Sequence, residues 1–176
     1  FRPVALVPAF QAAETVGEVV DGLLRHVPEV LVVDDGSKDA SGAVAARAGA
    51  RVLRLDVNSG KGTAIRAGLA TLLESDATHV AFVDADGQHD PADLPALLEA
   101  AREGDPFVIG SRMADREAIP AARYRTNEIG SRILSRMTGF EVKDGQSGYR
   151  VLSTNLLRQF RLSARGYSIE TEILLK

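Results

Sequence analysis

The sequence predicts an α/β fold in which a mostly parallel sheet is flanked by helices. Along the first 112 residues, short apolar segments rich in β-branched residues alternate with segments whose apolar residues recur at helical spacing. Such alternation is typical of strands joined by crossover helices, which cover both faces of a parallel sheet. No linker, repeat or low-complexity stretch divides the 176 residues. We therefore expect a single domain over residues 1–176.

The expected strands are short, nearly continuous apolar runs, a pattern that suits strands buried on both faces. PVALVPA, at 3–9, is the first of them, and EVLVVDD, at 29–35, ends in two acidic residues. After residue 112 the alternation becomes less regular, although GQSGYRVLS still reads as a strand. The expected strands cover residues 3–9, 29–35, 51–55, 78–84, 106–112 and 145–153.

The expected helices are recognised by apolar residues three and four positions apart and by their first residues. Val16, Val19, Val20 and Leu23 have this spacing in the first helix. Ser37 or Asp39 can cap a helix after the second strand, and proline at position 91 suits a first helical turn. The first helix covers residues 14–26, and further helices are expected at 62–75, 91–103, 127–138 and 154–160, with a last one from about 168.

Composition excludes several classes of site and partner. The chain has no cysteine, which rules out disulfides, thiolate metal sites and a cysteine nucleophile. Only 5% of the residues are aromatic and no dense Lys/Arg run occurs, so nucleic acid is not an expected partner. No apolar run approaches the roughly 20 residues of a membrane span, and no signal peptide is evident. We expect a cytoplasmic protein, with further chain beyond Lys176 that could carry a membrane anchor.

Charge is distributed unevenly along the chain. Residues 1–110 hold 9 Lys/Arg against 17 Asp/Glu, whereas residues 111–176 hold 12 against 7. One interpretation is chance variation of solvated helix faces. The other is an acidic half that holds a cation and a basic half that meets an anion.

Polar motifs follow four of the expected strands directly. They are PAF after the first strand, DDGS after the second, DADGQ after the fourth and GSR after the fifth. Ligands of open α/β sheets bind outside the carboxyl ends of the strands. Asp and Gly are common in turns, so any one motif could be structural. Together they predict one binding site at a single edge of the sheet.

The segment DADGQHD predicts a divalent metal site. Asp84 and Asp86 lie two residues apart at a strand end, where their carboxylates would repel one another without a cation. Mg²⁺ and Mn²⁺ prefer oxygen ligands and keep positions for substrate phosphates. Gln88 adds an amide oxygen, while His89 is interpreted as a turn or surface histidine.

The segment NSGKGTAIRAG, at 58–68, is glycine-rich but matches neither common phosphate-binding pattern. Ile65 replaces the last glycine of GxGxxG, and Gly62 follows Lys61 where the P-loop has Ser or Thr. The segment still leads into a helix N-terminus, which favours an anion or nucleobase nearby. Arg112 and Arg150 are candidate anion clamps, because guanidinium binds phosphate in a bidentate way.

These motifs, in this order and spacing, resemble family 2 glycosyltransferases of the GT-A fold. The resemblance is strongest to the branch of dolichol-phosphate mannose synthases and polyprenyl-phosphate glycosyltransferases, and it covers nearly the whole chain. It implies an inverting transfer of a sugar from a nucleotide-sugar with Mg²⁺ or Mn²⁺. Residues 1–112 would then bind the nucleotide-sugar, and 113–176 would form the acceptor side, truncated at its C-terminus. The motifs are VPAF, VVDDGSKD, NSGKGTAIRAG, DADGQHDP, GSR, DGQSGYR and IETEI.

The resemblance also implies roles for individual residues. Asp86 and Gln88 would hold the metal, and Asp84 would organise the ribose or sugar of the donor. Asp35 would read the base, and Gln11 and Ala12 depart from the Asn and Glu that the family often has there. The candidate catalytic residues are Asp84, Asp86, Arg112, Arg150 and Glu172, and the candidate donor-binding residues are Pro8, Phe10, Asp35, Ser37, Lys61 and Asp84.

The acceptor decides whether the reaction needs a base. A lipid phosphate at a membrane surface is already an anion and needs none, whereas a hydroxyl acceptor would need Asp144, Glu170 or Glu172 as base. The basic second half favours the lipid phosphate, and with it the cytoplasmic face of a membrane. The alternatives are transfer to a hydroxyl of a cell-envelope glycan, a sugar-phosphate nucleotidyltransferase and a non-catalytic nucleotide-sugar-binding module. The nucleotidyltransferase would need a glycine-rich loop after the first strand, which AFQAAET is not.

Overall fold

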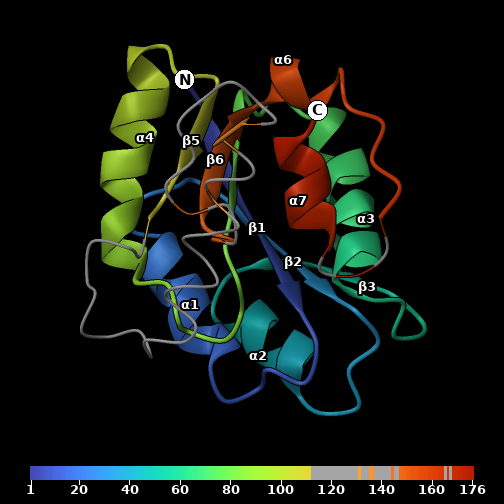
Figure 1. Ribbon diagram of the computed structural model, residues 1–176. Helices are drawn as coiled ribbons and strands as arrows, with labels where there is room; N and C mark the ends of the chain where they lie inside the picture. Colours follow the sequence, from blue (N-terminus) through green and yellow to red (C-terminus); the bar gives the residue numbers. More distant parts are fainter. Residues whose placement is uncertain (112–130, 132–134, 137–143, 145–146, 165, 167) are drawn as a thin grey trace.

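The computed structural model describes residues 1–111, 131, 135–136, 144, 147–164, 166 and 168–176. Its sheet has the strand order β3-β2-β1-β4-β6-β5, and helices lie on both sides of it (Figure 1). The strands are β1 (Pro3–Ala9), β2 (Val30–Asp34), β3 (Arg51–Arg54), β4 (His79–Phe82), β5 (Phe107–Ile109) and β6 (Arg150–Ser153). The helices are α1 (Val16–Leu23), α2 (Ser41–Arg47), α3 (Lys61–Leu73), the 3₁₀ turn η1 (Pro91–Asp93), α4 (Leu94–Glu103), α6 (Thr154–Leu157) and α7 (Ser168–Leu174).

The predicted α/β class and mostly parallel sheet are confirmed. Strands β1 to β4 are parallel, so their carboxyl ends meet at one edge. The sixth strand differs from the simple alternation, because β6 lies between β4 and β5 and runs antiparallel to both. Arg150 opens β6 and is paired with Phe82 on one side and Ile109 on the other. The last strand thereby brings a residue from the second half of the chain beside the end of β4.

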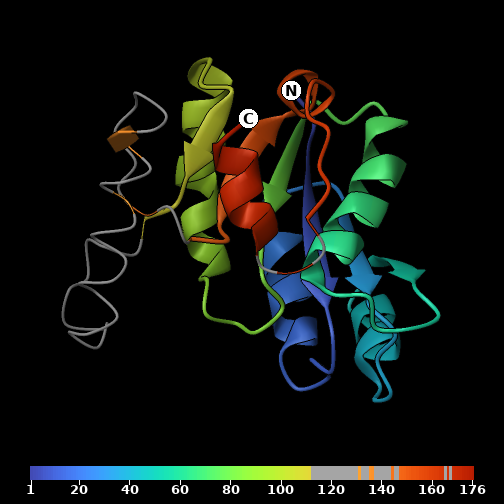
Figure 2. The same cartoon turned by 45° about the vertical axis from the view of Figure 1, so that its right-hand side comes forward.

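Two apolar cores separate the sheet from its helices. Helices α1, α2 and α4 pack on one face through Ala5 and Val7 of β1. Helices α3, α6 and α7 pack on the other through Val4 and Leu6. This alternation follows from the two-residue period of a strand, and Figure 2 shows α4 and α3 on opposite sides of the strands. Among the residues that the structure describes, no helix has the length and apolar character needed to cross a membrane.

Helix α3 lies close to the sheet because glycine occupies position 68. A Cβ there would overlap the side chains of Leu6 and Val33. Close packing fixes α3 over β1 and β2, and therefore fixes Lys61 at the start of the helix. The sequence thus positions one charged residue at the carboxyl edge of the sheet.

Several predicted boundaries move by a few residues. Strand β4 ends at Phe82 instead of residue 84, so Asp84 and Asp86 lie in the loop that follows it. The last strand begins at Arg150 instead of residue 145. The structure describes only three residues of the helix expected at 127–138, and Arg112 lies outside the described residues.

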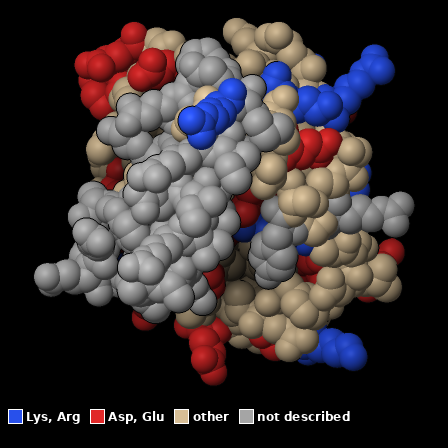
Figure 3. Space-filling model, in the orientation of Figure 1, with Lys and Arg blue, Asp and Glu red and all other residues tan. Residues whose placement is uncertain are grey.

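On the face in Figure 3, acidic side chains gather over the end of α4 and basic ones around α6.

Candidate functional site

A cavity of about 670 Å³ opens at the carboxyl edge of the parallel strands. Its walls come from the β1–α1 loop, the glycine-rich segment before α3 and the loop after β4. Three of the four motifs expected at this edge, PAF, DDGS and DADGQ, contribute residues to the cavity. The described residues that line it are Pro8, Ala9, Phe10, Gln11, Ala12, Ala13, Glu14, Thr15, Asp35, Asp39, Asn58, Gly60, Lys61, Ala64, Asp84, Ala85, Asp86 and Gly166.

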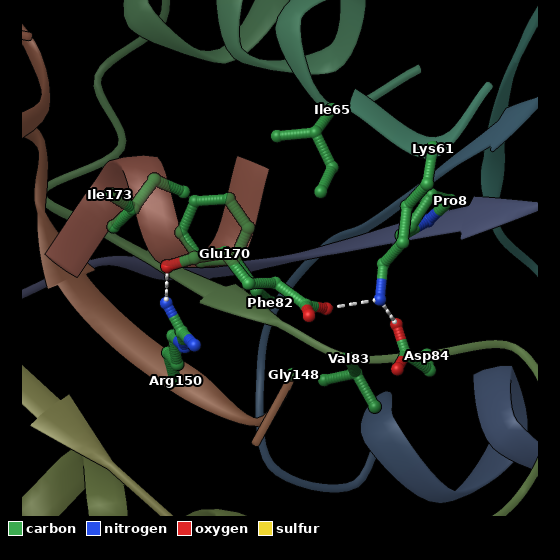
Figure 4. A pocket seen from close by; sticks show the side chains of 10 residues that line it. All are labelled: Pro8, Lys61, Ile65, Phe82, Val83, Asp84, Gly148, Arg150, Glu170 and Ile173. Carbon is green, nitrogen blue, oxygen red and sulfur yellow. Dashed lines mark hydrogen bonds and ion pairs between the residues drawn. The ribbon is translucent and has the colours of Figure 1, made fainter. Parts of the chain in front are cut away.

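Lys61 bridges two carboxylates at one end of this cavity. Its Nζ lies 2.5 Å from Asp84 Oδ1 and 2.5 Å from Glu170 Oε1, so residues from α3, the β4 loop and α7 converge (Figure 4). Burial alone would lower the pKa of the Lys61 ammonium, but the two carboxylates outweigh burial and raise its pKa above the usual value. Lys61 is therefore a fixed positive charge beside the loop after β4 that carries Asp84 and Asp86, which we call the acidic loop.

The acidic loop presents two carboxylates of different exposure to the cavity. Asp84 is half-buried and is held by Lys61, whereas Asp86 and Gln88 are exposed. Asp86 Oδ1 accepts the backbone N–H of Gln88 at 3.0 Å, which shapes the turn between them. His89, expected as a turn or surface histidine, lies in this loop but is buried, with Nε2 3.9 Å from Asp84 Oδ2.

Gly148 leaves the space that Asp84 occupies. A Cβ at position 148 would lie 2.7 Å from Asp84 Oδ2, closer than two such atoms can approach. Next to it, Tyr149 packs its ring against His89 with centroids 5.0 Å apart. The segment directly before β6 therefore packs against Asp84 and His89.

Asp35 holds the glycine-rich segment by its backbone. Its Oδ1 accepts the N–H of Ser59 at 2.9 Å and its Oδ2 accepts the N–H of Gly60 at 2.7 Å. Gly60 has φ +91°, a conformation that favours glycine, and it directly precedes α3. Asp35 also lines the cavity, so its predicted contact with a nucleobase stays a prediction beside this structural role.

The β1–α1 loop is held by hydroxyl groups. Ser37 is buried, its Oγ accepts the N–H of Gln11 at 3.0 Å, and its own N–H donates to Asp34. Ser37 is not among the residues that line the cavity, so the structure places it behind the wall. Pro8 and Phe10 do line the cavity, and their expected contact with the nucleobase stays a prediction.

Arg150 is almost fully buried, with 1% of its surface exposed. Its Nε donates to the carbonyl of Ser147 at 2.7 Å and its Nη1 to the carbonyl of Glu170 at 2.6 Å. Burial lowers its pKa to about 10, against the opposing effect of nearby carboxylates, so the guanidinium stays charged at neutral pH. It lines a small cavity of about 10 Å³ beside the main one, where it ties α7 to β6.

Of the two acidic residues on α7, Glu170 points toward the site. Its carboxylate binds Lys61, whereas the carboxylate of Glu172 accepts hydrogen bonds from Ser163 and Ala164. Glu172 lines neither cavity of this site, so its predicted catalytic role stays a prediction.

The site fits a divalent metal that is completed by its substrate. Among the described residues, no group of three His, Cys, Asp or Glu side chains could hold an ion. Asp84 and Asp86 nevertheless both line the cavity with oxygen donors. Mg²⁺ and Mn²⁺ are commonly held by one or two carboxylates together with substrate phosphates. These two carboxylates suit such a metal when a diphosphate supplies the remaining ligands.

Sequence reasoning missed the bridge formed by Lys61 and the role of Gly148. Lys61 and Glu170 are 109 residues apart, and no local pattern connects them. Only one indication was available in the sequence: Lys61 lies in NSGKGTAIRAG and Glu170 in IETEI, two of the motifs that resemble the family. Gly148 lies within GQSGYR, but in this motif only Arg150 was considered as a candidate site residue.

Residues 4–161 match the family model described as Glycosyl transferase family 2. Glycosyltransferase AglJ of Haloferax volcanii is 34% identical over 176 residues, which cover 97% of this chain and 56% of AglJ. Undecaprenyl-phosphate mannosyltransferase of Micrococcus luteus is 33% identical over 188 residues, which cover 99% of this chain and 77% of that protein. The chain thus spans little more than half the length of AglJ.

The fold is similar to that of glucosyl-3-phosphoglycerate synthase from Mycobacterium tuberculosis. That structure superimposes with a TM-score of 0.77 at 25% identity, covering 98% of this chain and 64% of the synthase. The same enzyme in complex with Mn²⁺ and UDP-Glc gives a TM-score of 0.73 at 25% identity, covering 98% of this chain and 63% of that chain. The GT-A fold expected from the sequence is confirmed by this similarity.

Proposed function

The chain belongs to glycosyl transferase family 2, and we propose that it transfers a hexose from a UDP- or GDP-linked donor to a polyprenyl or dolichyl phosphate, with inversion at the anomeric carbon. The family expected from the motifs is confirmed by the match over residues 4–161. The observation that carries the proposal is the cavity of about 670 Å³ in which Asp84, Asp86 and Lys61 converge. The undecaprenyl-phosphate mannosyltransferase among the relatives supports the class of acceptor.

The cavity suits the two ends of a nucleotide-sugar. Its volume lies within the range of roughly 300–1,000 Å³ that is usual for small-molecule sites. Pro8, Phe10 and Asp35 line the part that would hold the nucleobase. Lys61 and the acidic loop lie at the other part, where the diphosphate and the sugar would be held.

Asp86, expected as a metal ligand, and Asp84, expected to organise the donor, both line the cavity and would hold Mg²⁺ or Mn²⁺. Gln88, the other expected ligand, is exposed and is not among the residues that line the cavity. A bound divalent cation would neutralise the charge that develops on the leaving nucleoside diphosphate. Lys61 would supply a second, protein-borne positive charge at the same end of the cavity. Such charges act strongly because they are fixed before the reaction begins.

The acceptor phosphate would attack the anomeric carbon from the face opposite the diphosphate. A new bond forms between a phosphate oxygen and this carbon as the bond to the diphosphate oxygen breaks. A phosphate is already ionised near neutral pH, so no proton has to be removed. We propose that the reaction takes place at a membrane surface, because a polyprenyl chain resides in a bilayer, and the cytoplasmic face stays the expectation from the sequence.

A transfer assay tests the proposal directly. The chain is incubated with Mn²⁺, radiolabelled UDP-glucose or GDP-mannose and a short polyprenyl phosphate in detergent. The matched control is the same polyprenol without its phosphate. The proposal expects label in the lipid fraction only when the phosphate is present. Equal labelling of the free alcohol would show that the acceptor is a hydroxyl group. If neither UDP-glucose nor GDP-mannose labels either lipid, the proposal is contradicted.

A further inference from the structure

The turn at Ser163–Ala164 is held by side chains from two different helices. Glu172 of α7 accepts the backbone N–H of Ser163 at 2.9 Å and that of Ala164 at 2.9 Å, and it accepts the Ser163 hydroxyl at 2.9 Å. Arg66 of α3 donates its Nη1 to the carbonyl of Ser163 at 3.2 Å. These hydrogen bonds to both the N–H and the C=O groups restrain the turn relative to α3 and α7.

Helix α3 lines the donor cavity through Lys61 and Ala64, and α7 reaches the same place through the ion pair between Glu170 and Lys61. Lys61 lies five residues before Arg66 on α3, and Glu170 lies two residues before Glu172 on α7. The Lys61–Glu170 ion pair therefore joins the helices at the cavity, while Arg66 and Glu172 join them through the turn. Gly166, three residues after Ser163, lines the cavity itself.

We propose that Glu172 is a positioning residue for the donor: together with Arg66 it fixes the Ser163–Ala164 turn, and thereby the cavity wall at Gly166 and the placement of Glu170 against Lys61. This inference rests on the proposed function, because the ligand whose binding it controls is the nucleotide-sugar. It assigns to Glu172 a role in donor affinity instead of one in the chemical step.

The contacts of Glu172 argue against its acting as a base. Both carboxylate oxygens accept hydrogen bonds from the turn, and neither of the site's two cavities is lined by Glu172. The backbone N–H groups of Ala164 and Ser163 lower the pKa of Glu172, which makes it a weaker base. A base must also reach the proton that it removes.

Three variants separate these roles. Glu172→Gln keeps the length of the side chain but presents an amide N–H₂ to a backbone N–H, so one side of the turn loses its acceptor. Arg66→Met removes the contact with the Ser163 carbonyl and keeps the aliphatic stem. Glu74→Gln is the matched control, because Glu74 is an exposed carboxylate at the C-terminal end of α3.

The readouts are donor affinity by calorimetry, using whichever of UDP-glucose and GDP-mannose the wild type binds with Mn²⁺, and the kinetics of the transfer assay. We expect Glu172→Gln and Arg66→Met each to raise the donor Kd and KM about five- to tenfold, with kcat within twofold of wild type. Glu74→Gln should change neither quantity.

Other outcomes overturn the inference in distinguishable ways. A fall in kcat of a hundredfold or more in Glu172→Gln, with the donor Kd unchanged, would show a general base. Unchanged Kd, KM and kcat in both variants would show that the turn does not control the cavity. A wild-type chain that binds neither nucleotide sugar would instead overturn the proposed function, and with it the inference.

Discussion

Lys61→Met should destabilise the fold at pH 7, because two carboxylates lose the cation that they share. Asp84 Oδ1 and Glu170 Oε1 each lie 2.5 Å from Nζ, so these oxygens are no more than 5 Å apart. At an effective dielectric constant of about 20, their mutual repulsion is about 3 kcal/mol. Side-chain movement and partial exposure reduce this, so we expect a loss of about 2 kcal/mol, between the values for surface and buried pairs.

Thermal unfolding followed by circular dichroism measures this loss. For a chain of this size, about 2 kcal/mol corresponds to a fall in Tm of roughly 4–8 °C. Lys38→Met is the matched control, because Lys38 is an exposed lysine, and its Tm should stay within about 1 °C of wild type.

The raised pKa of Lys61 determines how its contribution to stability changes at alkaline pH. A group whose pKa is raised by folding contributes stability that is fully present below its unfolded pKa, here 10.5, and is lost as the pH rises through the folded value. The difference in Tm between wild type and Lys61→Met should therefore shrink above pH 10.5. Equal Tm values for wild type, Lys61→Met and Lys38→Met at pH 7 would refute the bridging role.

Three further substitutions test the loop, the metal and the packing. Gly148→Ala should weaken donor binding about tenfold, because its Cβ would displace Asp84; unchanged affinity in calorimetry would show that Asp84 can move without consequence. Asp86→Ala should abolish Mn²⁺-dependent transfer while the circular dichroism spectrum stays native, and full turnover in this variant would remove Asp86 from the metal site. Gly68→Val should lower the free energy of unfolding by about 1–3 kcal/mol in urea titration, because its side chain overlaps Leu6; wild-type stability would show that α3 shifts freely.

The elements of the first half could be predicted because their signals are local. Apolar runs and helical spacing identified the parallel strands and their helices, and the motifs after the strands identified the edge that holds the cavity. The position of β6 could not be predicted in this way. Its pairing with β4 and β5 is a long-range choice, and the apolar run that forms it reads the same in either direction.

The same distinction between local and long-range signals explains which site residues could be identified from the sequence. Asp84 and Asp86 lie in one short motif, and both line the cavity. Glu170 and Glu172 are two positions apart on a helix, so they point to different sides, and only the fold decides which one faces Lys61. Asp35 was visible as an acidic residue at a strand end, but its bonds to Ser59 and Gly60 depend on a segment 24 residues away.

Calorimetry with a nucleotide panel tests most directly the claim that the cavity is a metal-dependent nucleotide-sugar site. UDP, GDP, ADP, UDP-glucose and GDP-mannose are titrated into the chain with and without Mn²⁺. The cavity and its two aspartates predict binding of a UDP or GDP form that is strong with Mn²⁺ and at least tenfold weaker without it. Failure of every nucleotide to bind in the presence of Mn²⁺ would contradict the account.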